Sequence, residues 1–100
     1  MAEKAGDRRT VTVRIEGRVQ GVFYRAWTEQ TARRLGLDGT VRNMGDGSVE
    51  ATYSGPAAAV AEMLRRSAEG PKDAQVTEVT VVREGGSVAP GFKVLGTDWR

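Results

Sequence analysis

The sequence predicts a single α+β domain in which two helices cover one face of a four-stranded antiparallel sheet. Its apolar residues alternate with a period of two in the expected strands and recur at helical spacing in the expected helices. The segments follow the order β-α-β-β-α-β, which is the order of the ferredoxin-like split βαβ arrangement. A length of 100 residues suits one domain with one core.

The first strand is expected from Thr10 onward. Val11, Val13 and Ile15 alternate there with polar residues, as in a half-buried strand. Residues 1–9 are polar and charged and show no periodicity, so we expect them to form a disordered arm. The domain itself would then span residues 10–97.

The first helix should follow a glycine-bearing loop at residues 17–21. Its apolar stripe at three- and four-residue spacing consists of Phe23, Ala26, Trp27, Thr31 and Leu35. Phe23 and Trp27 would therefore pack in the core, whereas Tyr24 lies off the stripe and would flank a site or lie on the surface. Gly36 followed by Leu37 is typical of a glycine C-cap with its hydrophobic contact.

A β-hairpin is predicted around the turn at residues 44–47, because Asp46-Gly47 separates two alternating segments. The second helix should open at Pro56 and stop at Gly70, with Val60, Met63 and Leu64 facing inward.

Two further strands are expected near the C-terminus. The alternating segment at residues 74–84 is predicted to be the fourth strand, and the segment GFKVLG at residues 91–96 a possible short fifth strand at the sheet edge.

The composition excludes several classes of chemistry. The absence of cysteine excludes disulfides, thiolate metal sites and cysteine nucleophiles, and the absence of histidine removes the usual general base and the commonest metal ligand. We therefore expect no metal and no cofactor. No apolar run approaches the roughly 18 residues of a membrane span, and no signal peptide is evident, so we expect a soluble cytoplasmic protein without a membrane partner. A net charge of +2, with 15 basic and 13 acidic residues interspersed, suits a small anionic ligand better than nucleic acid.

The segment EGRVQGVFYR at residues 16–25 joins a strand to a helix through a loop with two glycines. Such a junction leaves backbone N–H groups without intrahelical partners, and the helix dipole favours an anion there. The spacing matches neither a Walker loop nor a dinucleotide-binding loop, so an anion site and a plain structural turn both remain open. Arg25 lies about one turn into the helix, where the dipole disfavours a cation; it either points into solvent or binds a phosphate with its planar fork.

Asn43 is an amide at a position where the alternation calls for an apolar residue. The pattern puts it on the face shared with Val41 and, across the hairpin, with Val49, Ala51 and Tyr53. It is either a turn asparagine that bonds its own backbone or an inward amide at the mouth of the core.

The segments GRVQGVFYR and LGLDGTVRNMGDGSVEATYSGP resemble the acylphosphatase family, and the resemblance extends from residue 11 to about residue 95. It implies a monomeric enzyme that hydrolyses the carboxyl–phosphate bond of small acyl phosphates, with inorganic phosphate as product and competitive ligand. Arg25 would bind the phosphate and Asn43 would hold the attacking water. The substrate-binding loop, acting through its backbone amides, would comprise Arg18, Val19, Gln20, Gly21, Val22, Phe23 and Tyr24.

The side chains of the loop and the two chain ends are expected to matter less than the motifs. The side chains of Arg18 and Gln20 are expected to be solvated or to face the acyl end of the substrate. The charged arm before Thr10 and the tail TDWR at residues 97–100 depart from the family pattern, and we expect neither to touch the motifs.

Three other functions fit the sequence less well. RNA-recognition domains share the element order, but they stack bases on aromatic residues of the exposed sheet face, where this chain is expected to present Ser48, Glu50 and Thr52. A metallochaperone of this fold would need cysteines. A related domain that binds anions without turnover is disfavoured because both Arg25 and Asn43 are present.

Overall fold

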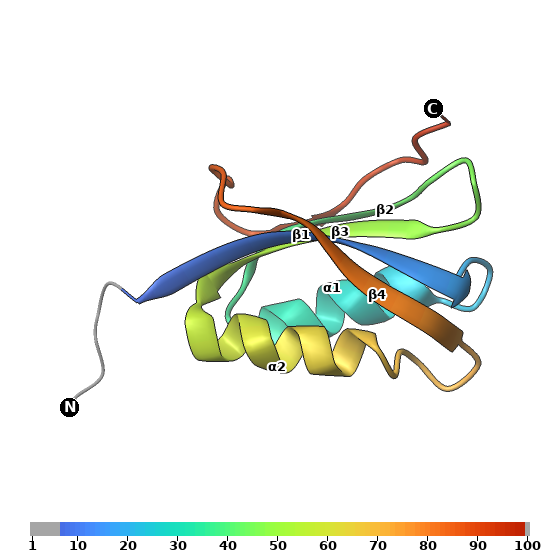
Figure 1. Ribbon diagram of the computed structural model, residues 1–100, viewed down its shortest axis with the longest axis horizontal. Helices are drawn as coiled ribbons and strands as arrows, with labels where there is room; N and C mark the ends of the chain where they lie inside the picture. The colour runs from blue at the N-terminus through green and yellow to red at the C-terminus, as the bar shows by residue number, and fades with distance from the viewer. Residues whose placement is uncertain (1–6, 100) are drawn as a thin grey trace.

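The computed structural model describes residues 7–99 and has the predicted element order, with two helices on one face of a five-stranded sheet (Figure 1). The strands run in the spatial order β4-β1-β3-β2-β5. The elements are β1 (Arg8–Arg18), α1 (Tyr24–Arg34), β2 (Asp38–Asn43), β3 (Val49–Pro56), α2 (Ala57–Ser67), β4 (Gln75–Glu84) and β5 (Phe92–Val94). The ferredoxin-like α+β prediction is confirmed, and the short fifth strand exists. Because β5 pairs with β2 in parallel, the sheet is mixed.

The first strand begins two residues earlier than its alternation indicated. Arg8 and Arg9 pair with Pro56 and Gly55 of β3, and Arg9 binds Glu84 of β4 at 2.9 Å. This part of the expected arm is therefore strand, formed by polar residues at the end of the sheet, which the apolar pattern could not show. Residues 1–6 of the arm lie outside the described residues.

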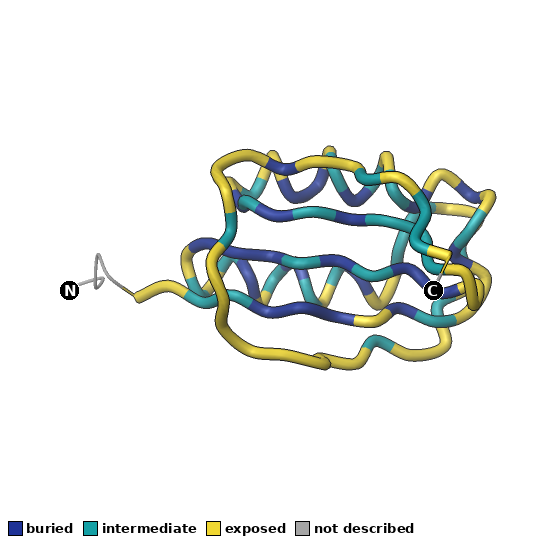
Figure 2. The backbone as a smooth tube through the Cα atoms, turned by 90° about the horizontal axis from the view of Figure 1, so that it is seen from above, coloured by how far each residue is buried: buried dark blue, intermediate teal, exposed yellow. Residues whose placement is uncertain are grey.

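The core lies between the sheet and the helices, and the central strands supply most of it (Figure 2). Val13 of β1, Val41 of β2 and Val49 of β3 are fully buried, and the ring of Tyr53 stacks on Phe92 of β5 at a centroid distance of 6.2 Å. The edge strand β4 is mostly exposed. The core is thus built mainly from the faces that the strand pattern predicted.

The buried face of α1 differs from the predicted stripe. Its buried residues are Tyr24, Thr28, Thr31 and Ala32. Phe23 is 80% exposed and Trp27 is only partly buried, so the expectation of a core position is wrong for Phe23 and holds in part for Trp27. Tyr24 is 1% exposed rather than at the surface. A threonine can line this face because the Thr28 hydroxyl donates to the Tyr24 carbonyl at 2.8 Å, which satisfies it within the helix.

Two buried tyrosines tie the helices and the sheet together through Ser67. The Tyr24 hydroxyl donates to the Ser67 carbonyl at 2.6 Å, and the Ser67 hydroxyl donates to the Met63 carbonyl at 2.8 Å. The Ser67 proton is therefore used, so the Tyr53 hydroxyl is the donor in its 2.7 Å bond with Ser67 Oγ. Burial raises the pKa of both tyrosines, which keeps their protons available for these bonds.

The two predicted turns have the expected geometry. After α1, the N–H groups of Gly36 and Leu37 donate to the Arg33 and Ala32 carbonyls at 3.1 and 2.9 Å, with Gly36 at φ 74°. This is the glycine C-cap that the sequence predicted.

The hairpin turn is closed by a bond from Met44 N–H to the Ser48 carbonyl at 2.9 Å. Ser48 is 4% exposed rather than open to solvent as expected, and its N–H and hydroxyl both donate to Asp46 Oδ1. These two bonds hold the pKa of Asp46 below its usual value.

The second helix follows Pro56 directly, with Val60 and Met63 fully buried as predicted. On its exposed side, Glu62 accepts hydrogen bonds from Arg65 at 2.5 Å and from Arg66 at 2.7 Å. These bonds lower the pKa of Glu62 to about 2, and the bond from Arg65 has the larger effect.

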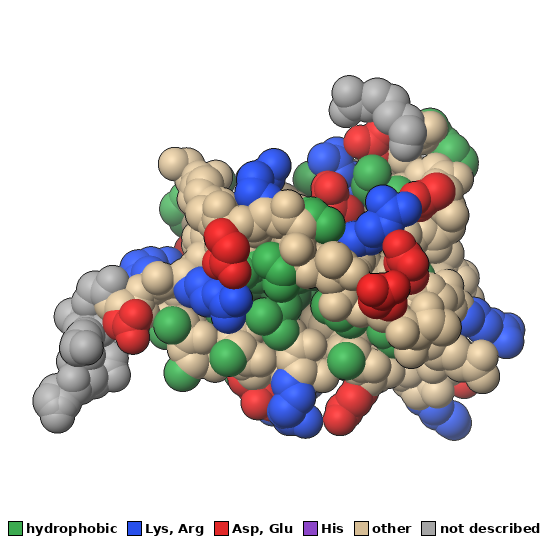
Figure 3. Space-filling model, in the orientation of Figure 1, with side chains coloured by type: hydrophobic (Ala, Val, Ile, Leu, Met, Phe, Trp, Pro, Cys, Tyr) green, Lys and Arg blue, Asp and Glu red, His purple; other side chains and the backbone are tan. Residues whose placement is uncertain are grey.

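Acidic and basic side chains are interspersed over the face that Figure 3 shows. Within residues 7–99, neither helix is long and apolar enough to cross a membrane.

Candidate active site

The loop between β1 and α1 presents unused backbone donors. Within the described part of the chain, the N–H groups of residues 21–26 donate no hydrogen bond, and the first such bond of α1 runs from Trp27 to the Phe23 carbonyl at 3.0 Å. Just before this loop, Gly17 lets the end of β1 lie close against β4, because a Cβ there would lie 2.2 Å from the Gln75 carbonyl oxygen. Gly21 has a φ of 75°, which a glycine adopts without strain. A helix N-terminus with free N–H groups is suited to bind an anion.

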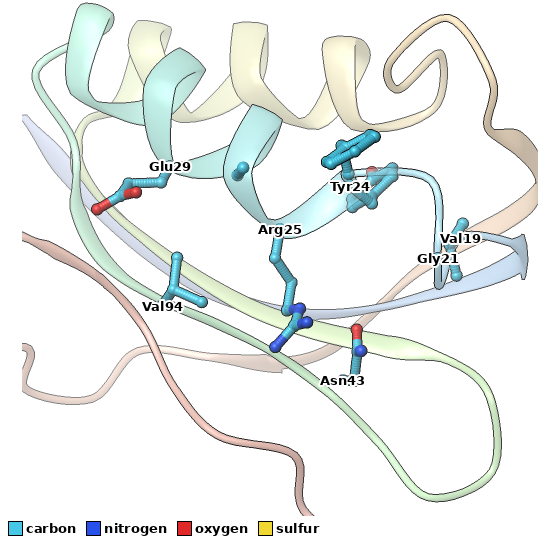
Figure 4. Close-up of a pocket in the computed structure, with 9 residues that line it drawn as sticks. Val19, Gly21, Tyr24, Arg25, Glu29, Asn43 and Val94 are labelled. Atoms are coloured by element: carbon cyan, nitrogen blue, oxygen red, sulfur yellow. The ribbon is translucent and has the colours of Figure 1, made fainter.

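Arg25 and Asn43 line one open cavity of about 410 Å³. The Arg25 side chain leaves the first turn of α1 and points toward Asn43 at the end of β2 (Figure 4). The other lining residues are Val19, Gly21, Phe23, Tyr24, Ala26, Glu29 and Val94. The sequence did not single out Ala26, Glu29 and Val94 as site residues, although Phe92 and Val94 alternate in the way that puts both on the helix side of β5.

The two polar side chains at the centre of the cavity have no partner within residues 7–99. No hydrogen bond or ion pair joins the Arg25 guanidinium to another described residue. The nearby carboxylate of Glu29 is instead paired with Arg33 at 3.0 Å. The Asn43 Oδ1 atom is buried and accepts no hydrogen bond. The cavity therefore combines a free cation with a free acceptor, both available to a ligand.

Asn43 faces inward, which agrees with the interpretation of it as an amide at the mouth of the core. It pairs with Val49, and Val41 pairs with Ala51, so the amide lies on the same face as buried valines. The turn reading, in which the amide bonds its own backbone, is wrong for its oxygen. A buried amide oxygen without a partner costs stability, which makes its position at a cavity notable.

Gln20 ties the loop to the hairpin that carries Asn43. Its Nε2 donates to the Met44 carbonyl at 2.9 Å and to the Ser48 carbonyl at 2.8 Å. The expectation that this side chain is solvated or faces the acyl end is therefore wrong. Sequence reasoning missed this contact because the two partners are backbone atoms far along the chain.

The remaining predicted loop residues divide by direction. Arg18 does not line the cavity of Arg25; it lines a separate shallow hollow with Lys72 and Asp73. The side chain of Val22 is 6% exposed and belongs to the core, as does that of Tyr24. These two residues can therefore reach a ligand mainly through their backbone N–H groups.

The C-terminal segment contacts the backbone of Asn43, contrary to expectation. It continues from β5 alongside β2, where Leu95 N–H donates to the Val41 carbonyl at 2.9 Å and Asp98 N–H to the Asn43 carbonyl at 2.9 Å. Gly45 N–H donates in turn to the Asp98 carbonyl at 2.7 Å. The tail TDWR thus touches the motif around Asn43, through single bonds too widely spaced to leave a periodic pattern in the sequence.

Comparison with known proteins shows the family to which the chain belongs. The family model described as acylphosphatase matches residues 11–94. An acylphosphatase of Rhizobium meliloti is 51% identical over 89 residues, which cover 88% of this chain and 94% of that protein. One of Rhodospirillum rubrum is 50% identical over 84 residues, 84% of this chain and 92% of that protein. The crystal structure of acylphosphatase from Bacillus subtilis superimposes with a TM-score of 0.82 at 29% identity and covers 87% of this chain and 98% of that one. The chain belongs to the acylphosphatase family.

Proposed function

We propose that the protein hydrolyses the carboxyl–phosphate bond of acyl phosphates by in-line attack of a water molecule that Asn43 orients. One observation carries this mechanism: the unpaired guanidinium of Arg25 and the unpaired amide oxygen of Asn43 share a cavity beside the free N–H groups of residues 21–26. The products are a carboxylate and inorganic phosphate.

Arg25 and the loop hold the phosphoryl group. The planar guanidinium can bond two phosphoryl oxygens at once, a geometry that lysine cannot supply. The loop N–H groups and the dipole of α1 add further positive charge at the same end of the helix. Positioning and charge stabilisation are the main requirements of phosphoryl transfer, and each oriented donor contributes about 3–4 kcal/mol in the transition state.

Asn43 supplies the geometry of attack. Its Oδ1 accepts a hydrogen bond from water and directs a water lone pair at phosphorus, opposite the carboxylate oxygen that leaves. The bond from the water oxygen to phosphorus forms while the bond to the acyl oxygen breaks, and the carboxylate departs with the bonding electron pair. A neutral amide is no base at pH 7, so the water proton passes to the phosphate or to solvent. The leaving carboxylate needs little acid assistance, which fits a chain without histidine.

The role of Arg25 is tested with Arg25→Lys, assayed on benzoyl phosphate. The variant should lose most of its activity, because lysine keeps the positive charge but lacks the planar guanidinium that bonds two oxygens at once. Arg34→Lys, an exposed position of the same helix, is the matched control and should keep wild-type turnover. Near-normal turnover of Arg25→Lys would refute the bidentate contact.

The role of Asn43 is tested with Asn43→Ala. Its kcat should fall by about 10²-fold, the scale of one oriented catalytic group, while the inhibition constant of inorganic phosphate stays unchanged. A variant that loses phosphate affinity in parallel would instead show that Asn43 binds the ligand. Phosphate binding without turnover by the unaltered protein would favour a non-catalytic anion-binding domain.

Four further expectations accompany the mechanism. Activity should survive EDTA, since the positive charge at the site comes from Arg25 and backbone N–H groups; loss of activity would contradict this account. The sequence also predicts a monomeric, cytoplasmic protein that does not bind nucleic acid, and the first of these is checked by size-exclusion chromatography with light scattering.

A further inference from the structure

Phe23 has an unfavourable backbone conformation and an unfavourable environment. Its φ and ψ are 64° and 25°, and it is the only residue other than glycine with a positive φ within residues 7–99. Bulky side chains rarely adopt this left-handed region. Its ring is also 80% exposed, between the buried Val22 and Tyr24. The residue therefore adds strain without adding to the core.

Phe23 does not stabilise the helix either. It occupies the N-cap of α1, where serine, threonine, aspartate, asparagine or glycine is preferred, and it makes no side-chain capping bond. A glycine would adopt the same conformation without strain. A strained, exposed aromatic residue beside a candidate site is the kind of outlier from which a function can be inferred.

The cavity gives the ring something to contact. The exposed large apolar side chains within residues 7–99 are Phe23, Val81, Val82, Val94 and Trp99. Phe23 and Val94 both line the cavity of Arg25, and Val94 approaches it from β5 (Figure 4). One water molecule occupies about 30 Å³, and a phosphoryl group counted as two or three such volumes brings the total to roughly 100 Å³. The cavity of about 410 Å³ leaves room for an acyl group beside them.

We propose that Phe23 is a specificity-determining residue that, with Val94, contacts the acyl group of the substrate and favours aromatic acyl phosphates over small aliphatic ones. This inference rests on the proposed function. With the phosphoryl group at Arg25, the acyl group extends along the apolar side of the cavity, where an aromatic ring packs edge-to-face or offset on Phe23. The left-handed conformation turns the ring out of the core and makes it available for this contact.

The test compares benzoyl phosphate with acetyl phosphate in Phe23→Gly and Phe23→Asn. Both replacements tolerate the left-handed conformation and remove the ring. The kcat/KM for benzoyl phosphate should fall by about tenfold, the upper range of an aromatic contact. The kcat/KM for acetyl phosphate should fall several-fold less, so the ratio of the two kcat/KM values is the readout of the acyl contact. Phe23→Gly should unfold at the same temperature as wild type or a higher one.

Two further variants sharpen the result. Val94→Thr keeps the shape of the side chain and replaces one methyl group by a hydroxyl. It should lower the benzoyl-to-acetyl ratio of kcat/KM less than the Phe23 variants do. Val82→Ala, an exposed apolar position of β4 outside the cavity, should leave the ratio unchanged.

Each outcome bears on the proposal. An equal loss for both substrates would show that Phe23 positions the loop, and no loss for either would show that the ring does not contact the acyl group; both results overturn the inference. If the unaltered protein hydrolysed neither substrate, the proposed function itself would fail, and the acyl contact with it.

Discussion

The contact between Gln20 and the hairpin carries a quantitative prediction. Gln20→Met keeps the length of the side chain and removes both hydrogen bonds to the Met44 and Ser48 carbonyls. Those carbonyls keep a backbone donor each, from Gly47 at 3.1 Å and from Met44 at 2.9 Å, so neither is left without a partner. The loss should therefore be two net hydrogen bonds of about 1 kcal/mol each, or about 2 kcal/mol in the free energy of unfolding.

This loss is measurable in two ways. In a domain of 100 residues, about 2 kcal/mol corresponds to a fall of roughly 8–16 °C in Tm. Because Gln20 holds the loop against the hairpin of Asn43, kcat for benzoyl phosphate should also fall. Urea unfolding with an unchanged m-value measures the first effect, and Gln30→Met, an exposed position of α1, is the matched control.

Gln20→Glu adds a pH signature to the same test. A carboxylate facing two carbonyl oxygens is repelled by them, so its pKa in the folded protein would be raised above the usual value of about 4.3. Its destabilisation should be small at pH 4, where the protonated acid still donates, and should grow as the pH rises. If the free energy of unfolding of Gln20→Met lies within about 0.5 kcal/mol of the wild-type value, the two bonds do not hold the loop and the prediction is wrong.

Three other predictions follow from the described contacts. Ser67→Ala should cost about 1–3 kcal/mol, because it leaves the buried Tyr53 hydroxyl without an acceptor, and Tyr53→Phe in the same chain should recover part of the loss in chemical denaturation. Glu62, whose pKa is lowered to about 2 by hydrogen bonds from two arginines of its helix, stabilises the fold above pH 4.5 and loses this effect as the pH falls through 2. The Tm difference between wild type and Glu62→Gln should accordingly vanish at low pH. Truncation before Asp98 removes the backbone bonds that hold Asn43 and Gly45, so kcat should fall by up to about 10²-fold while the inhibition constant of phosphate stays unchanged. The same truncation made in the Asn43→Ala variant should not lower kcat further.

The sheet could be predicted because its strands are buried on one face. Alternation in β1, β2 and β3 identified the inward positions correctly, including that of Asn43 beside Val41. The hairpin and the glycine cap could be predicted for a related reason: both depend on neighbouring residues whose conformational preferences are strong.

The buried face of α1 could not be predicted from apolar spacing. Thr28 and Thr31 are polar by composition and buried in the structure, and the first of them is satisfied within its own helix. Phe23 is apolar but exposed, because it adopts the left-handed conformation just before the helix, and this conformation turns its side chain outward. Contacts that join distant segments, such as Gln20 with the hairpin and Asp98 with Asn43, leave no local signal at all.

The cavity gathers features that each oppose folding. Arg25 is a partly buried cation without a partner, Asn43 has a buried acceptor without a donor, and Phe23 is strained and exposed. Elsewhere buried hydroxyl groups such as those of Ser67 and Thr28 are satisfied, and Asn43 Oδ1 is the one fully buried side-chain polar atom without a partner within residues 7–99. Three unfavourable features at one place, in a fold that is otherwise well satisfied, indicate a binding site. A ligand with an anionic and an apolar group, bound together with one water molecule, would pair with the cation, contact the aromatic ring and fill the free acceptor.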